Sequence, residues 1–209
     1  MEKINRYIVE KLKLTKDRFK KQPFNAHTHN YVDLGLPSGN IWATEPCGGF
    51  KYYLWSTDID VSSKRWNDDK SALSLKMPPK FNFDTCRAVM NGDWEVPSVE
   101  DFQELIDNCK IEPGDECVVF TGPNGKELIF RTNMVYCNAG DHFSADEEWA
   151  DRIGAFWTRD LSKHSSKYAV AFFIDTDEEP HAGFYDSPNN GLYEGNEYGM
   201  QIMGVIHRY

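Results

Sequence analysis

An Asn-Gly pair between two short apolar segments limits the fold of this 209-residue chain more than any other local pattern. Asn124-Gly125 separates residues 117–120 from residues 127–130. Asn-Gly is the preferred sequence of two-residue hairpin turns because both positions accept a positive φ. Both flanking segments are too short for a helix and contain the β-branched and aromatic residues that favour strands. The pattern therefore predicts a β-hairpin.

Similar short apolar runs recur from residue 31 to the C-terminus, separated by turn residues. Two helices are expected between them, one near residues 84–90 and one over residues 99–109, where Ser98 supplies an N-cap. Residues 55–80 lack periodicity and are expected to form a long surface excursion. This alternation predicts a small α+β domain, with further strands at 32–34, 41–44, 155–158, 168–174 and 201–206.

The first twenty residues have a different character. Ile4, Ile8 and Leu12 recur at four-residue spacing beside Tyr7, which predicts a helix with a narrow apolar stripe. An isolated helix of this length is marginal, so the stripe is expected to pack on the body, on a second copy or on a partner. We therefore expect an assembly helix over residues 1–20, a linker over 21–30 and the α+β domain over 31–209.

Charge is distributed unequally along the chain. Residues 1–21 contain eight basic and three acidic residues, so their net charge is +5 and residues 22–209 carry −15 of the total of −10. So acidic a body repels phosphate backbones, which argues against nucleic acid as the main partner. No apolar run is long enough to span a membrane, and the charged N-terminus lacks a signal-peptide core. We expect a protein made in the cytoplasm and not secreted through a signal peptide.

The residues that commonly carry chemistry show no catalytic or metal-binding spacing. The five cysteines form no CxxC pair, and His27 and His29 lack a third ligand at a recognisable distance. The acidic clusters within residues 141–151 and 175–179 could offer oxygen ligands to calcium, but neither follows EF-hand order. We therefore expect reduced thiols, no catalytic residue, no metal site and no cofactor.

Residues 184–199 combine tyrosine with asparagine, glycine and glutamate, which is the composition of binding loops. Tyrosine supplies rigid contact area, and asparagine supplies adaptable hydrogen bonds. The alternative interpretation is a β-hairpin with aromatic cross-strand pairs. Under the first interpretation the ligand-binding residues are Tyr185, Asn189, Asn190, Tyr193, Asn196 and Tyr198.

Four segments together resemble the Fibrobacter succinogenes major paralogous domain. Residues 31–44 (YVDLGLPSGNIWAT) resemble its opening, and residues 94–105 (WEVPSVEDFQEL) resemble its central signature. Residues 121–125 (TGPNG) and 156–158 (FWT) resemble its hairpin and a later strand, so the similarity covers about residues 31–209 in order. The resemblance implies a C-type-lectin-like fold whose C-terminal strands and loops present a variable binding surface.

The resemblance also directs the functional hypothesis. The fold is shared with formylglycine-generating enzymes and phage tropism proteins, but the reactive cysteine pair of the oxidase branch is not recognisable here. Residues 4–17 resemble leader helices on virion proteins of phages that infect Bacteroidales. We therefore expect a non-enzymatic virion component, such as a head fibre or decoration protein. Ile4, Tyr7, Ile8 and Leu12 would anchor it, as a homo-oligomer, to other virion subunits.

In this hypothesis the C-terminal face meets host surface glycans or neighbouring subunits. Two alternatives stay open at this point. One is a relative of the sulfatase-modifying oxidases, which would need two cysteines that meet in space. The other is a host-encoded protein-binding module.

Overall fold

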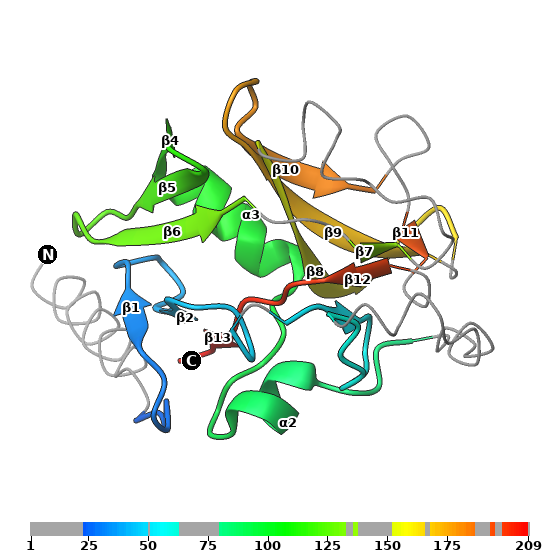
Figure 1. Cartoon of the computed structure of the whole chain (residues 1–209). Coiled ribbons are helices and arrows are strands. Elements are labelled where there is room, and N and C mark those ends of the chain that lie inside the picture. Colours follow the sequence, from blue (N-terminus) through cyan, green and yellow to red (C-terminus); the bar gives the residue numbers. More distant parts are fainter. Residues whose placement is uncertain are drawn as a thin grey trace, which may run out of the picture.

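Figure 1 shows the computed structural model of the chain. The structure describes residues 23–49, 51–62, 80–132, 136–137, 152–165, 168–186, 193–194 and 198–208. The expected helix over residues 1–20 lies outside these ranges. The described residues form short antiparallel strands and two helices, which confirms the α+β class.

The first and last strands of the described chain lie in one small sheet. β2 (Ile41–Ala43) is its central strand, with β1 (Tyr31–Asp33) on one side and β13 (Val205–Ile206) on the other. The sequence predicted one strand over residues 201–206. In the structure residues 202–204 are not in a strand, and β13 begins only at Val205. The beginning and the end of the domain are therefore joined by backbone hydrogen bonds.

The Asn-Gly hairpin is confirmed. β5 (Cys117–Thr121) pairs with β6 (Glu127–Arg131), with Gly125 at a φ of 79° in the turn. A third strand, β4 (Lys110–Gly114), pairs with β5 and was not predicted from the sequence. It contains a proline and is almost wholly exposed, which is tolerated because β4 is an edge strand.

Both expected helices are present and capped by side chains. α2 (Thr85–Met90) begins after Asp84, whose carboxylate accepts from the Arg87 amide. α3 (Val99–Asn108) begins with the capping box of Ser98 and Asp101, in which each side chain accepts from the backbone of the other. The helix boundaries therefore follow from local side-chain hydrogen bonds.

The longest strands form the centre of the molecule (Figure 1). β9 (Tyr168–Asp175) pairs with β8 (Ile153–Leu161) along one edge, and with β10 (Ala182–Tyr185) and β11 (Tyr193–Glu194) along the other. A fourth small sheet has the order β3 (Tyr53–Leu54), β12 (Tyr198–Met200) and β7 (Tyr136–Cys137).

Alternating residues of β8 and β9 send side chains into two separate clusters. Phe156 and Phe172 enter a phenylalanine-rich cluster with α3, in which Phe172 stacks on Phe102 at 4.2 Å between ring centroids. Trp157 and Ala171 enter a second, tryptophan-rich cluster. The central sheet is thus covered on both faces. Within the described residues, neither helix has the length and apolar composition needed to cross a bilayer.

Two segments contact the body more closely than their composition indicated. Residues 23–30 belong to the expected linker, yet the Asn25 amide donates to Asp93 at 2.7 Å and the Trp94 indole donates to the Ala26 carbonyl at 3.0 Å. Trp55, at the start of the expected surface excursion, is buried and donates its indole N–H to the Thr158 carbonyl. Residues 63–79 of that excursion lie outside the described part of the chain.

Candidate binding face and pocket

Tyr185 is the one predicted ligand-binding residue whose side chain the structure describes. It ends β10, lies on the same face of the sheet as Phe173 of β9, and is half-buried where it packs against the tryptophan-rich cluster. The two rings stack with centroids 4.7 Å apart and an angle of 26° between their planes. We call the surface formed by Phe173, Gly183 and Tyr185 the aromatic ledge.

Gly183 makes this stack possible. It lies opposite Phe173 in the β9–β10 register, and a Cβ placed on it would lie 2.7 Å from the Phe173 ring. The absence of a side chain therefore lets the phenylalanine ring lie over the neighbouring strand, where it supports Tyr185. The aromatic ledge therefore depends on the pairing of a glycine on β10 with an aromatic residue on β9.

Charged groups border the aromatic ledge at the β9–β10 turn. Burial raises the pKa of the Tyr185 hydroxyl, the negative charge of Asp175 raises it further, and Arg152 opposes the shift. The Arg152 guanidinium lies 3.9 Å from Asp175 and 3.2 Å from Glu178. The face therefore combines an aromatic surface with hydrogen-bonding groups of both charges.

The other predicted ligand-binding residues are placed only in part. Tyr193 pairs with Ala169 in β11, and Tyr198 pairs with Cys137 in β12, so these two backbones belong to different sheets. The three predicted asparagines, Asn189, Asn190 and Asn196, lie outside the described residues, as do the predicted anchoring residues Ile4, Tyr7, Ile8 and Leu12. The described part of residues 184–199 is thus mainly strand backbone, and Tyr185 is the one predicted ligand-binding side chain placed there.

A pocket of about 400 Å³ lies between the hairpin strand β6 and the segment that follows β2. Its lining includes three buried apolar side chains, Phe130, Phe156 and Met203, and its wall includes Tyr52 and the half-exposed Ile129. Nothing in the sequence analysis indicated this pocket, because its walls come from separate segments spread between residues 44 and 203. We call it the β6 pocket.

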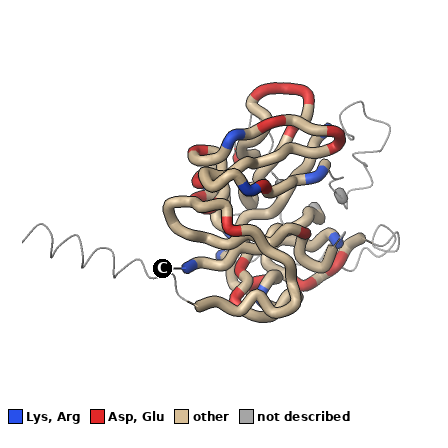
Figure 2. The backbone as a smooth tube through the Cα atoms, turned by 90° about the vertical axis from the view of Figure 1, so that its left-hand side faces the viewer, with Lys and Arg blue, Asp and Glu red and all other residues tan. Residues whose placement is uncertain are grey.

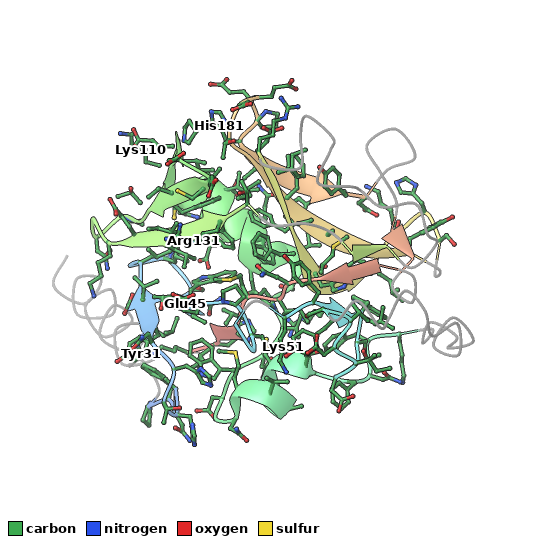
Figure 3. All side chains as sticks on the ribbon, viewed as in Figure 1. Tyr31, Glu45, Lys51, Lys110, Arg131 and His181 are labelled. Carbon is green, nitrogen blue, oxygen red and sulfur yellow. The ribbon has the colours of Figure 1, made fainter. Side chains whose placement is uncertain are left out.

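The polar lining of the β6 pocket is mainly acidic. Glu45, Glu116, Glu127 and Arg131 line it, which gives a formal charge of −2. Figure 3 labels Glu45 and Arg131 on the side of the molecule where β6 faces the segment after β2. All four side chains belong to residues that are mostly exposed or lie at the pocket rim.

A buried polar network lies beside α3 and was also missed from the sequence. His207 approaches Asp101 at 2.9 Å and Glu95 at 3.4 Å. Asp101 also accepts from Ser98 and Asn40. The hydrogen bond to Asp101 raises the pKa of the His207 imidazole, although burial opposes the shift. Because Ser98 and Asp101 also form the capping box of α3, we assign to this network a role in stabilising the start of that helix.

His27 and His29, the histidine pair noted in the sequence, lie in different surroundings. His29 Nε2 lies 3.0 Å from the Met90 carbonyl oxygen, whereas His27 Nδ1 lies 3.2 Å from the Thr28 hydroxyl. The two rings therefore have separate partners. Among the described residues, no group of three histidine, cysteine or acidic side chains is arranged to hold a metal ion.

Cys47 and Cys86 are the described cysteines that meet in space. Both are fully buried, and Cys86 donates to the Met203 carbonyl at 3.4 Å. Burial raises the pKa of the Cys86 thiol well above its usual value, and its hydrogen bond with Cys47 adds to the shift. Reactive cysteines need an accessible thiolate, so this environment disfavours the oxidase alternative.

Comparison of the chain with family models, with curated proteins and with solved structures finds no match. The resemblance to the major paralogous domain therefore rests on the four sequence segments quoted above.

Proposed function

We propose that the chain is a non-enzymatic virion protein, a head fibre or decoration subunit with a C-type-lectin-like domain that binds carbohydrate on the host surface. Residues 1–20 would anchor the domain to other virion subunits, and the aromatic ledge would face the ligand. The observation that carries the proposal is the Tyr185–Phe173 stack beside Arg152 and Asp175. An aromatic face next to charged hydrogen-bonding groups suits a sugar ring, whose C–H groups stack while its hydroxyls bond.

The positions of the family-like motifs support the same proposal. Trp42, Trp94 and Trp157, which each belong to one of the quoted segments, are fully buried. Ser98 and Asp101 of the central signature form the capping box of α3. Residues that carry the resemblance therefore serve the core and the helix start, while the ledge on β10 lies outside the quoted motifs. A packed scaffold with a separate binding surface is the arrangement that the resemblance implies.

Binding of the fluorescently labelled full chain to Bacteroidales cells, measured by flow cytometry, tests the proposal. We expect saturable binding that is lost when the cells are first treated with periodate, which oxidises vicinal diols of glycans. Binding that survives periodate but is lost after protease treatment would identify a protein receptor and contradict the carbohydrate proposal. Absence of the protein from purified virions, measured by peptide mass spectrometry, would contradict the virion assignment.

A further inference from the structure

The acidic β6 pocket and the basic N-terminal segment are complementary. Within residues 22–209 the charge is −15, and Figure 2 shows that acidic residues predominate on the side of the molecule that carries β4 to β6. In the pocket itself three glutamates accompany one arginine. Residues 1–21 carry +5, the one strongly basic stretch of the sequence.

The pocket also offers what the apolar part of that segment requires. Ile129 lies in the pocket wall and is 40% exposed, which is high for a large apolar side chain. Phe130, Phe156 and Met203 extend the apolar surface inward. Lysine and arginine side chains bury an aliphatic stem while their charged ends reach acidic groups, so one basic amphipathic segment satisfies both parts of the lining.

We infer that the β6 pocket binds basic and apolar side chains from residues 1–21 of a second copy of this chain, with Glu45, Glu116 and Glu127 contacting its lysines and arginines. The inference builds on the proposed assembly role of residues 1–20 and names the surface that completes it. Because the segment and the pocket are different surfaces of each copy, the contact closes either by reciprocal exchange of segments in a two-fold dimer or by head-to-tail addition around a ring. The charged groups would set the register, and the apolar groups would contribute most of the affinity.

Zero-length carbodiimide crosslinking of the full chain tests this directly, since it joins a lysine amine to a carboxylate in direct contact. Unlabelled and ¹⁵N-labelled proteins are mixed, crosslinked and mapped by peptide mass spectrometry. We expect mixed-isotope links from lysines of residues 1–21 to Glu45, Glu116 or Glu127. Links confined to a single copy would overturn the inference. Mixed-isotope links to other carboxylates would overturn the pocket but leave the assembly role intact.

A matched pair of variants separates specific contacts from overall charge. Glu45→Gln/Glu116→Gln/Glu127→Gln should weaken self-association about ten-fold or more, measured by sedimentation velocity. Asp58→Asn/Glu100→Gln/Glu179→Gln removes the same charge from exposed positions outside the pocket and should leave association nearly unchanged. Equal weakening of self-association by both variants would show that only net charge matters. It would overturn the inference that the β6 pocket is the binding site. Circular dichroism of both variants checks that the fold is retained.

Discussion

His207 Nε2 lies 2.9 Å from Asp101 Oδ1, which ties the C-terminal end of the chain to the first turn of α3. The aspartate is held in turn by the Ser98 amide at 2.8 Å and by the Asn40 side chain at 2.9 Å. Both partners of the pair are nearly enclosed, with 11% and 8% of their side chains exposed. The hydrogen bond between His207 and Asp101 thus joins residues more than 100 positions apart in the sequence and links the last described strand to α3.

The first prediction concerns pH. The pKa of His207 is raised in the folded state, so its stabilising contribution is complete below about pH 6.5, the usual value of histidine, and is lost as the pH rises through the folded value. We expect the free energy of unfolding, measured in urea, to fall as the pH rises from about 6.5 through the raised pKa of the folded state. His207→Gln should cost about 1–3 kcal/mol at pH 6 and remove much of this dependence. An unchanged slope in the variant would contradict the assignment.

The same pair of residues also predicts how the stability of the fold changes at acidic pH. Burial would raise the pKa of Asp101, but hydrogen bonds from His207 and Ser98 overcome this and hold the pKa below its usual value. A depressed carboxylate stabilises the fold above its unfolded pKa, near pH 4, and loses that contribution as the pH falls through the folded value. Asp101→Asn should therefore be less sensitive to acid than the wild-type chain, measured by unfolding between pH 2 and pH 5.

The second prediction concerns the N-terminal boundary. Removing residues 1–22 should change the melting temperature little, because the apolar stripe of Ile4, Ile8 and Leu12 is narrow and offers little surface for packing on the body. Removing residues 1–30 should destabilise the domain by about 1–3 kcal/mol, because it leaves the buried Trp94 indole N–H without its acceptor and removes the Asn25–Asp93 bond. Equal melting temperatures for the two truncations would show that residues 23–30 are only a linker.

The third prediction concerns the contact between Gly122 in the β5–β6 turn and Leu34, which follows β1. A Cβ added to Gly122 would lie 2.3 Å from the Leu34 carbonyl oxygen, so the backbones of the two segments would have to separate. Gly122→Ala should cost about 1–3 kcal/mol of stability. Gly125→Asn is the matched control, since a Cβ there meets nothing within 4 Å and asparagine tolerates positive φ. A larger loss of stability in Gly125→Asn than in Gly122→Ala would contradict the prediction, because it would show that strain in the turn matters more than the contact with Leu34.

The fourth prediction concerns the thiols. Cys86 should react with iodoacetamide only as fast as the domain opens, because it is fully buried and its pKa is raised. Cys109, with a pKa raised to about 11 and partial exposure, should also be a weak nucleophile. Cys47→Ala/Cys86→Ala should reduce stability without affecting cell binding. Rapid labelling of the native pair, or copper-dependent oxidation lost in this variant, would favour the oxidase alternative.

Local patterns predicted the fold better than they predicted the sites. The Asn124-Gly125 turn and the Ser98 cap are specified by neighbouring residues, and both were found as expected. β10 was overlooked because Gly183 interrupts the apolar pattern, yet that glycine is what accommodates Phe173. The β6 pocket and the His207 network join segments distant in sequence, so no local spacing could indicate them. Composition predicted a binding segment over residues 184–199, and Tyr185 is the one predicted ligand-binding side chain there that the structure places.

The central claim is that Tyr185 on the aromatic ledge contacts a host carbohydrate, and cell binding of Tyr185 variants measures it most directly. We expect Tyr185→Ala to lose about 1–2 kcal/mol of binding, roughly a five- to thirty-fold weaker Kd in flow cytometry, while Tyr185→Phe keeps the ring and loses less. Tyr31→Ala, which removes a tyrosine that is 50% exposed on β1, is the matched control and should bind normally. Normal binding by Tyr185→Ala, or weakening that is equal in Tyr31→Ala, would contradict the claim.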